Sequence, residues 1–378
     1  MRAGSETLGR QLRSRVTPDG RVELFIQTTP VRVPEAHEVL VRVEAAPINP
    51  SDLGLLLARA DPSTFERLER DGAVLLSGRI PARALPGLQA RIGEAQSVGN
   101  EGAGTVVAAG ATPAAQALLG RKVAVAGGGM YADYRLVPAK EVFELPPHVS
   151  AAQGASSFVN PMTALCMIEV MRAEGHVGLV HTAAASNLGR MLNRICKSDD
   201  IPLVNIVRSS AQRTVLEAGG ALHVVDSSDL AFARDLANAI RDTQATLAFD
   251  AVGGGELATQ ILSAMEANAS HPAAGYSRYG SSIHKQVYIY GGLDQGPTVI
   301  VRNFGMAWSI GGWLLRPVLA RLGPHVVERM RARIRAELTT TFVSQYAAEI
   351  SLEEVLDPDI AAAFDRKGTS SKYIIRLT

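Results

Sequence analysis

Cysteine is scarce in this chain of 378 residues, which has only Cys166 and Cys196. Two thiols cannot build a disulfide framework or a structural zinc lobe of four thiolates. Both lie in stretches with a helical pattern, where a free cysteine is typically a small buried apolar side chain. The eight histidines are scattered, without the paired spacing of metal ligands. The composition therefore gives no sign of a metal site.

An excess of charge is also lacking, since 38 Lys and Arg stand against 37 Asp and Glu, for a net charge of +1. This balance predicts no strong attraction to nucleic acid or anionic lipid. The first 15 residues lack the apolar core of a secretory signal, and the longest apolar candidate, residues 304–315, is too short to span a bilayer. We expect that segment to be a packed helix or an interface element, in a cytoplasmic protein with no nucleic-acid or membrane partner.

What the chain does contain is a globular balance, with 47% apolar and 20% charged residues, and enough length for two domains. The first 150 residues look β-rich. Alternation is clearest in residues 39–45, and short apolar runs end in turns such as Gly127–Gly129. Residues 61–97 differ, because they are charged, partly helical and interrupted by prolines. We interpret them as an insertion on the β domain.

After about residue 157, helical patterns alternate with short apolar strands. Such alternation indicates βαβ units and an α/β fold with a Rossmann-type doubly wound parallel sheet. The predicted helices of this part cover residues 161–173, 187–198, 210–218 and 229–241, with one more before the strand at 286–292. The chain should end with a helix, 358–366, and a strand, 372–378. The predicted domains are 1–157 with 325–378, and 158–324.

Residues 179–192, LVHTAAASNLGRML, have the outline of a nucleotide-binding turn with too few glycines. A dinucleotide fingerprint would place G-x-G-x-x-G here, whereas this chain offers Ala183-x-x-Ser186-x-x-Gly189. These side chains are small enough for a pyrophosphate to approach the N–H groups of a helix N-terminus, and Gly189 permits close packing of helix and sheet. An ordinary strand-to-helix corner has the same outline, so the turn alone leaves both interpretations open.

The end of the next strand favours nucleotide binding. About 20 positions after the turn, the fingerprint has an acidic residue for the ribose 2′-hydroxyl, or an arginine that accepts a 2′-phosphate. Here Arg208 follows the strand, Ser209 and Arg213 come next, and no carboxylate stands at the strand's end. The combination predicts NADPH as the cofactor rather than NADH.

Four further stretches carry a family resemblance: AAPINPSD (45–52), VGNEGAGTVVAAG (98–110), FVNPMTA (158–164) and FDAVGG (249–254). Their order and spacing resemble the medium-chain dehydrogenase/reductase superfamily. Within it, the chain is similar to the zinc-independent quinone oxidoreductases and the mitochondrial-type 2-enoyl thioester reductases, which share a glycine-poor turn. The resemblance implies a GroES-like catalytic domain, a Rossmann NADPH-binding domain, a pyrophosphate at the 183–189 turn and a homodimer.

The resemblance also implies chemistry without zinc. Zinc-dependent members have a cysteine where this chain has Asn49 and a histidine where it has Asn100. A carboxamide is a poor zinc ligand beside a thiolate or an imidazole. We therefore expect no metal at all among the site residues.

A protein that binds NADPH without a metal or a flavin is left with hydride transfer as its chemistry. Without a Lewis acid, a small conjugated carbonyl such as a quinone or an enone is the easier acceptor, because hydrogen-bond donors can stabilise the charge that spreads onto its oxygen. The related enoyl reductases use a tyrosine shortly after N-P-S-D as proton donor, and residues 53–67 contain none. A quinone or enone reductase is thus the leading hypothesis. The alternatives are a 2-enoyl thioester reductase and an NADPH-binding protein with little catalysis.

Two side chains are candidates for the reaction itself. Asn49 could contact the nicotinamide ribose or a substrate oxygen, and it could also cap a turn. Tyr131 could enter the same cleft or could be an aromatic residue of the core. His181 is expected to pack beside the fingerprint and not to act as a base. The candidate cofactor-binding residues are Asn160, Thr163, Ala184, Ala185, Ser186, Asn187, Leu188, Arg208, Ser209, Arg213, Val252, Gly253, Tyr290, Gly291 and Gly292.

Overall fold

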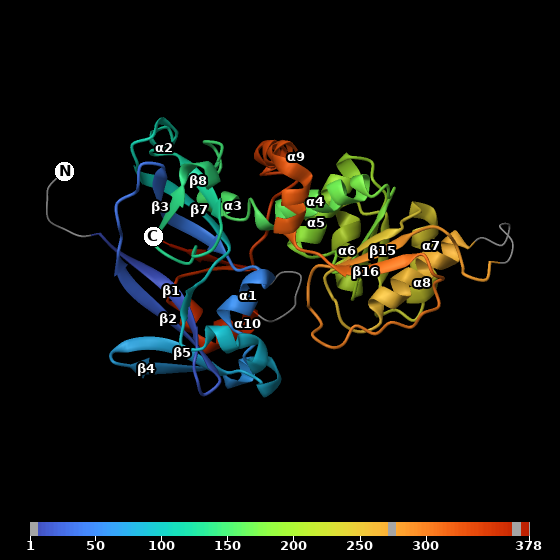
Figure 1. The fold of residues 1–378 in the computed structure, drawn as a ribbon, viewed down its shortest axis with the longest axis horizontal. Helices are drawn as coiled ribbons and strands as arrows, with labels where there is room; N and C mark the ends of the chain where they lie inside the picture. Colours follow the sequence, from blue (N-terminus) through green and yellow to red (C-terminus); the bar gives the residue numbers. More distant parts are fainter. Residues whose placement is uncertain (1–6, 271–276, 365–371, 378) are drawn as a thin grey trace. The chain divides into compact units, whose positions relative to one another are not determined.

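The computed structural model describes residues 7–270, 277–364 and 372–377 (Figure 1). The first six residues, the last two residues of the predicted helix 358–366 and Thr378 therefore lie outside the described residues. The chain divides into two compact units, one comprising Met1–Val159 with Leu338–Thr378 and the other Asn160–Glu337. The predicted boundary at 324/325 falls inside α9 (Leu315–Glu337), at the point where Gly323 leaves the helical conformation with φ 81° and ψ 166°.

The first unit is built on two sheets, and in one of them strand β18 from the C-terminal part of the chain pairs with β3. One sheet has the strand order β4-β5-β2-β1-β6, and the other has the order β10-β8-β7-β3-β18-β17, with β9 also paired to β3. The strands are β1 (Leu8–Val16), β2 (Arg21–Pro30), β3 (Glu38–Pro47), β4 (Glu66–Arg70), β5 (Ala73–Arg79), β6 (Ala95–Ser97), β7 (Glu101–Ala109), β8 (Lys122–Ala126), β9 (Tyr134–Pro138), β10 (Phe143–Glu144), β17 (Ala348–Ile350) and β18 (Tyr373–Arg376).

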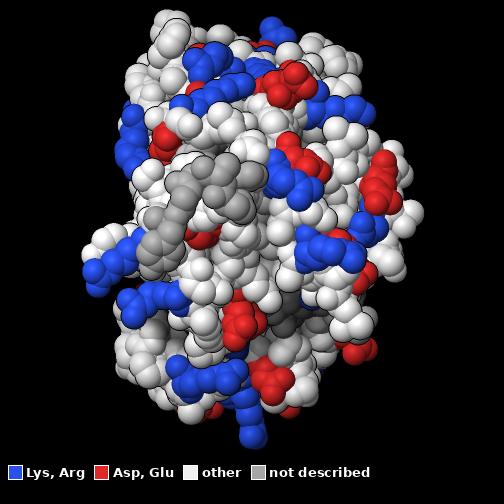
Figure 2. Space-filling view, turned by 90° about the vertical axis from the view of Figure 1, so that its right-hand side faces the viewer, with Lys and Arg blue, Asp and Glu red and all other residues white. Residues whose placement is uncertain are grey.

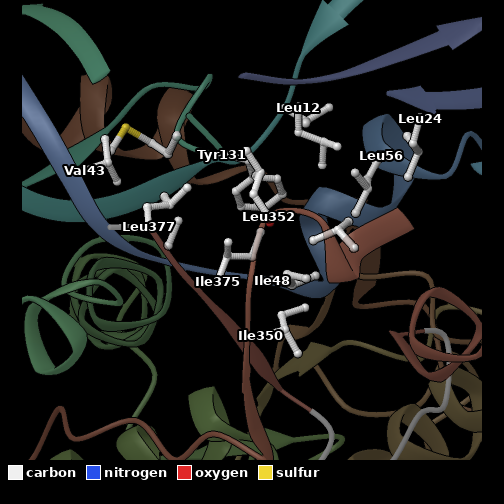
Figure 3. Close-up of a cluster of buried hydrophobic side chains, with 14 of the residues drawn as sticks. Leu12, Leu24, Val43, Ile48, Leu56, Tyr131, Ile350, Leu352, Ile375 and Leu377 are labelled. Atoms are coloured by element: carbon white, nitrogen blue, oxygen red, sulfur yellow. The ribbon is translucent and has the colours of Figure 1, made fainter. Parts of the chain in front are cut away.

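Short helices connect these strands. They are α1 (Pro50–Leu56), α2 (Pro113–Gln116), α3 (Ala151–Gly154), α10 (Pro358–Phe364) and the 3₁₀ segments η1 (Pro62–Thr64), η2 (Ala82–Arg91), η3 (Ala139–Glu141) and η5 (Glu354–Leu356). The core beneath them gathers Leu12 from β1, Leu56 from α1 and Ile375 from β18 into one apolar cluster (Figure 3). The predicted insertion, residues 61–97, adds η1, the β4–β5 hairpin, η2 and β6 to this unit. Its strand β4 has no buried residue, so it carries no apolar alternation that a sequence could reveal.

The second unit is a parallel six-stranded sheet with the order β13-β12-β11-β14-β15-β16. This is a doubly wound order that reverses between β11 and β14, so the predicted α/β class with a Rossmann-type sheet is confirmed. The strands are β11 (Leu179–His181), β12 (Leu203–Val207), β13 (His223–Asp226), β14 (Leu247–Asp250), β15 (Lys285–Ile289) and β16 (Trp308–Gly312). Helix α4 (Val159–Ala173) precedes the first of these strands, and the helices between them are α5 (Asn187–Ser198), α6 (Ser210–Ala218), α7 (Phe232–Thr243) and α8 (Leu257–Ala269).

For the apolar segment 304–315 the sequence predicted a packed helix or an interface element, and the structure shows no packed helix over it. Its centre is the edge strand β16, which pairs in parallel with β15, Lys285 opposite Trp308 and Ile289 opposite Gly312. Paired glycines disfavour a helix and tolerate an edge strand, and the apolar content alone does not separate the two. Among the described residues, no helix is long and apolar enough to cross a membrane. On the face drawn in Figure 2, basic and acidic side chains are interspersed, as the balanced composition predicts.

Candidate functional site

The 183–189 turn joins β11 to α5, and its only glycine serves internal packing. A Cβ atom on Gly189 would lie 2.1 Å from the carbonyl oxygen of Ala184, so no larger residue fits there. Ser186 is the N-cap of α5, and its Oγ accepts the N–H of Gly189 at 3.1 Å. Ala183 adopts a positive φ of 52°, a conformation that a glycine would take with less strain. The turn is therefore tight, and a side chain holds the start of its helix.

The small side chains of this turn face the interior of the second unit. Ala184 and Ala185 are buried in a cluster with Val207 of β12 and Leu216 of α6. Leu188 is buried as well, whereas Ser186 and Asn187 are partly exposed. Any ligand at this turn would therefore meet the backbone of 184–188 and the two polar side chains, not the alanine methyl groups.

A buried carboxylate shapes the loop that follows β14, the strand beside β11. Thr182 donates its hydroxyl to Asp250 at 2.8 Å, and the N–H groups of Val252 and Gly253 donate to the same carboxylate at 2.8 and 3.1 Å. Gly253 has a φ of 80°, and a Cβ there would lie 2.8 Å from the carbonyl oxygen of Gly291. The loops after β14 and β15 thus approach each other through glycine backbone. Because β11 and β14 flank the reversal in strand order, these loops stand where doubly wound sheets bind ligands.

Tyr290 and His181 form a hydrogen-bonded pair at the ends of β15 and β11. The Tyr290 hydroxyl lies 2.8 Å from His181 Nε2, and the two rings stack with centroids 5.9 Å apart. Burial lowers the pKa of His181 to about 3, so this imidazole stays neutral, and burial raises the pKa of Tyr290. Next to them, a Cβ on Gly292 would meet no described atom within 4 Å. The backbone at Gly292 therefore faces open space.

The carboxyl end of β12 presents an exposed arginine. Arg208 follows the strand directly, its N–H donates to the Gln212 side chain at 3.0 Å, and Ser209 is the N-cap of α6. Arg213 lies one turn into α6, with a guanidinium nitrogen 3.9 Å from a carboxylate oxygen of Glu217. Arg208 is thus the more exposed cation of the two.

Asn160 and Thr163 lie within the first turn of α4, which starts at Val159. Neither residue is therefore the N-cap of α4. Asn160 is partly exposed, and Thr163 is buried.

In the first unit, Asn49 and Asn100 meet the same buried carboxyl group. Asp52 lies in the first turn of α1, and its carboxylate accepts the backbone N–H groups of Asn49 at 2.8 Å and of Asn100 at 2.7 Å. Burial raises the pKa of Asp52 to about 7, although the two N–H donors oppose this shift. The Asn100 side chain donates to the exposed Ser51 hydroxyl at 3.1 Å. The N-P-S-D turn and the following G-N-E segment are thereby fixed to each other.

Glu101 is the second buried carboxylate of this cluster. One of its oxygens accepts the side-chain amide of Asn49 at 3.0 Å, and the other accepts the N–H groups of Phe158 and Val159 at 3.0 and 2.8 Å. Burial raises the pKa of Glu101, and the charge of Lys372 opposes that shift. The carboxylate therefore holds the start of α4, where a negative charge is stabilising.

Sequence reasoning missed most of this cluster. Asp52 and Glu101 stand inside recognised motifs, which was the available signal for them. Lys372 donates to the Ser156 hydroxyl at 2.8 Å and lies 5.7 Å from the ring centroid of Tyr346. Neither Lys372 nor Tyr346 belongs to a motif, and only the fold brings them near the other residues.

Tyr131 lies in the apolar core and not at a surface that a substrate could reach. The side chain is fully buried among the apolar side chains of the core (Figure 3). Its hydroxyl donates to the carbonyl oxygen of Pro47 at 3.0 Å. Its ring fills the space beside Gly99, where a Cβ would lie 2.5 Å from a ring atom. This placement argues against a catalytic role for Tyr131 and agrees with the alternative of a core aromatic.

Known proteins share this organisation. Residues 35–147 match the family model of the alcohol dehydrogenase GroES-like domain. A zinc-type alcohol dehydrogenase-like protein of Schizosaccharomyces pombe is 24% identical over 200 residues, which are 51% of this chain and 51% of that protein. The synaptic vesicle membrane protein VAT-1 homolog of Rattus norvegicus is 28% identical over 130 residues, 34% of this chain and 32% of that protein. The matches thus span about half of the first relative and a third of the second.

Solved structures match over almost the whole chain. A putative NADPH:quinone reductase from Mesorhizobium loti has a TM-score of 0.71 with 24% identity and covers 99% of both chains. A mutant enoyl thioester reductase from Candida tropicalis has a TM-score of 0.68 with 17% identity, over 98% of this chain and 100% of that one. A mycobacterial protein in complex with NADPH has a TM-score of 0.66 with 16% identity, over 97% and 99%. Residues 35–147 therefore match the alcohol dehydrogenase GroES-like domain, and the chain as a whole has the fold of these solved structures, which is the fold that the resemblance implied.

Proposed function

We propose that this chain is a zinc-independent, NADPH-dependent oxidoreductase that transfers hydride to a quinone or another conjugated carbonyl compound. The observation that carries the proposal lies at the carboxyl ends of β11 and β12. A tight turn of small residues starts α5 there, and the exposed Arg208 stands at the end of the neighbouring strand. This pairing fits a pyrophosphate at a helix N-terminus and a 2′-phosphate beside it.

The residues of the second unit fit a dinucleotide. The backbone of 184–188 would hold the pyrophosphate, and Arg208 with Ser209 and Arg213 would hold the 2′-phosphate. We assign the nicotinamide end to Asn160 and Thr163 and to the loops at 252–253 and 290–292, because the backbone at Gly292 faces open space. When bound, NADPH supplies the hydride.

The acceptor side is assigned to the N-P-S-D turn of the first unit. Its exposed Ser51 hydroxyl accepts from Asn100 and keeps its own proton to donate to a substrate oxygen. The Asp52 carboxyl binds the backbone on both sides, at Asn49 and Asn100, so it is a positioning residue. A hydrogen-bond donor held in this way would stabilise the negative charge that develops on a reduced conjugated carbonyl.

The two asparagines also support a reaction without zinc. Asn49 already donates its amide to Glu101, and Asn100 donates to Ser51. These hydrogen bonds use the amide N–H groups, so only the carboxamide oxygens would be left as ligands, and these bind zinc poorly.

A second candidate activity is the reduction of 2-enoyl thioesters. It is favoured by the enoyl thioester reductase among the solved structures with this fold. The lack of a tyrosine in residues 53–67 disfavours it, because the related enzymes use one as proton donor. The third alternative is an NADPH-binding protein with little catalysis. The expected homodimer and cytoplasmic location stay predictions.

The test follows NADPH absorbance with a matched panel of quinones, enones and enoyl thioesters. We expect turnover with quinones or enones and little with thioesters. Turnover of thioesters alone would establish the second candidate, and tight NADPH binding without turnover would establish the third. The Ser51→Ala variant should lower kcat and leave NADPH affinity unchanged, since Ser51 is assigned to the acceptor and not to the cofactor.

A further inference from the structure

A polar pocket in the first unit lies on residues that the proposed function does not use. Its volume is about 350 Å³. Two arginines, a triple-glycine loop and neutral polar groups line it. These residues come from β1, β6, β9 and the loop after β8, and they are Gln11, Arg13, Ala95, Gln96, Ser97, Gly127, Gly128, Gly129 and Arg135. No carboxylate is among these lining residues.

Neither arginine of this pocket is neutralised by an anion in the described chain. Arg13 donates to the oxygens of Gln11 at 3.1 Å, of Ser97 at 2.6 Å and of the Ala95 carbonyl, while its buried Nε has no acceptor there. Arg135 donates to the carbonyl oxygens of Gly128 at 2.9 Å and of Leu136 at 3.1 Å. Burial lowers the pKa of Arg135, and the charges of Glu141 and Glu38 oppose this shift, although neither carboxylate forms an ion pair with Arg135 in the described chain. Two partly buried cations with neutral partners favour an anionic ligand.

The glycine loop adds backbone donors. Gly127, Gly128 and Gly129 all have positive φ, at 140°, 98° and 72°. The Gly127 N–H donates to the Asn100 carbonyl at 3.0 Å, whereas the N–H groups of Gly128 and Gly129 have no acceptor among the described residues. A Cβ on Gly127 or Gly128 would meet no described atom within 4 Å. The loop is therefore open on the side of these two glycines, and an oxyanion could reach its backbone.

A neighbouring pocket of the same unit shows what a neutralised site looks like. Its volume is about 360 Å³, and it contains Arg15, Arg21 and Arg70 together with Asp19 and Glu23. Glu23 lies 2.6 Å from Arg15 and 2.9 Å from Arg70. There the cations already have carboxylate partners, so the pocket gives no reason to expect an anion.

We propose that the pocket formed by Arg13, Arg135 and the 127–129 loop binds a phosphate group, either free or carried by a small polar molecule. Guanidinium groups and backbone N–H groups are the donors that phosphate oxygens prefer. The volume exceeds that of one phosphate and leaves room for an attached group. The proposal is independent of the oxidoreductase assignment, because none of these residues belongs to the candidate cofactor or acceptor residues. The Gly127–Asn100 hydrogen bond does connect the pocket to the acceptor segment.

The test is calorimetric titration of the full chain with inorganic phosphate, inorganic pyrophosphate and glycerol 3-phosphate, with acetate as a carboxylate control. We expect saturable binding of at least one phosphate compound, weaker at high salt. Arg135→Gln and Arg13→Gln should each weaken it at least tenfold. Arg70→Gln, in the neutralised pocket, is the matched control and should leave it unchanged. Preference for glycerol 3-phosphate over phosphate would show that the ligand carries its phosphate on an organic group.

Ser186→Leu separates this site from the nucleotide turn. If Ser186→Leu abolishes phosphate binding and Arg135→Gln does not, the anion binds at the turn and the proposal is wrong. Absence of saturable binding to the wild-type chain, or equal loss in Arg70→Gln, would also overturn it. Because Arg13 links β1 to β6, the fold of Arg13→Gln is checked by a thermal melt. If that variant is unfolded, the test rests on Arg135→Gln alone.

Discussion

The side-chain amide of Asn49 donates to the carboxylate of Glu101 across 3.0 Å, and both side chains are almost fully buried. The other oxygen of Glu101 accepts the N–H groups of Phe158 and Val159 at the start of α4. Each oxygen of this buried carboxylate therefore has a donor, and Asn49 supplies the one for the first oxygen. Asn49 thus has a structural partner of its own.

We expect Asn49→Ala to lower the free energy of unfolding by about 1–3 kcal/mol, because it leaves a buried carboxylate oxygen without its donor. Urea denaturation at fixed pH measures the change. Asn100→Ala is the control, since its amide donates to an exposed hydroxyl and its loss should cost less. Equal losses of unfolding free energy in the two variants would show that the Asn49–Glu101 hydrogen bond does not stabilise the chain more than the exposed Asn100–Ser51 hydrogen bond does.

The purified chain should hold no stoichiometric zinc, and a chelator should not change its NADPH-dependent activity. The reason is the poor affinity of carboxamides for zinc at positions 49 and 100. Elemental analysis and activity after chelation check this together. One zinc per chain, with activity that disappears on chelation, would contradict it.

Arg208→Ala should weaken NADPH binding and leave NADH binding almost unchanged, since only NADPH carries the 2′-phosphate. A charge-assisted hydrogen bond contributes about 1.5–3 kcal/mol. The exposure of Arg208 puts the expected effect at the lower end, roughly tenfold in Kd. Calorimetry with both cofactors measures it. Arg213→Ala should have a smaller effect, because Glu217 lies beside that guanidinium.

Ser186→Leu should abolish NADPH binding in a chain that still folds, because a bulky side chain would stand where a phosphate approaches the backbone. Ser186→Gly should bind nearly normally. Since Ser186 caps α5, losing its hydroxyl should cost about 1 kcal/mol of stability. Ser186→Ala removes the cap and stays small, so it separates the two effects. A thermal melt and a cofactor titration on all three variants would disprove the assignment if the leucine variant bound normally.

Asp52 should make the chain less stable as pH rises from about 5 to about 8. Its pKa is raised to about 7, so the folded chain keeps a proton that the unfolded chain releases near the ordinary value of 3.8. The unfolded state then binds fewer protons, and stability falls by at most about 1.4 kcal/mol per pH unit. Relative to Asp52→Asn, the wild-type chain should lose free energy of unfolding across this range.

Asp61→Asn is the control for that experiment. Its carboxyl group is exposed, and hydrogen bonds from Ser63 lower its pKa, so it is ionised in both states at these pH values. The difference between wild type and Asp61→Asn should therefore not change between about pH 5 and about pH 8. If the difference in unfolding free energy between wild type and Asp52→Asn also stayed constant over this pH range, the raised pKa of Asp52 would be contradicted.

The sequence predicted the second unit well because its signals are local. Helices 187–198 and 210–218 have the predicted bounds, since Ser186 and Ser209 are N-caps that can be recognised in the chain. Strand β16 was not predicted, and a packed helix was one of the two alternatives for its segment, because five residues with two glycines give no clear period. Strand β4 was missed because none of its side chains is buried, so its sequence shows no apolar alternation.

The candidate site was predictable only where its residues stand in motifs. The candidates at 184–188 and at 208–213 follow from strand–turn–helix patterns, and these residues lie after β11 and β12. The pairing of Asn49 with Glu101 and the approach of Lys372 to Ser156 join segments distant in sequence. No local period or turn preference encodes such contacts. The burial of Tyr131 likewise depends on contacts between distant segments, since its hydroxyl donates to Pro47 and its ring lies against Gly99.

The tight approach of Ala184 to Gly189 has a consequence for recognising chains of this kind. The last glycine of the fingerprint is fixed by contact between the turn and its own helix, whatever the turn binds. The first position tolerates alanine at the expense of a strained φ, and the middle one accepts serine, which adds a helix cap. A search pattern anchored on the final glycine, with small residues allowed before it, would therefore find such turns where a three-glycine pattern passes over them.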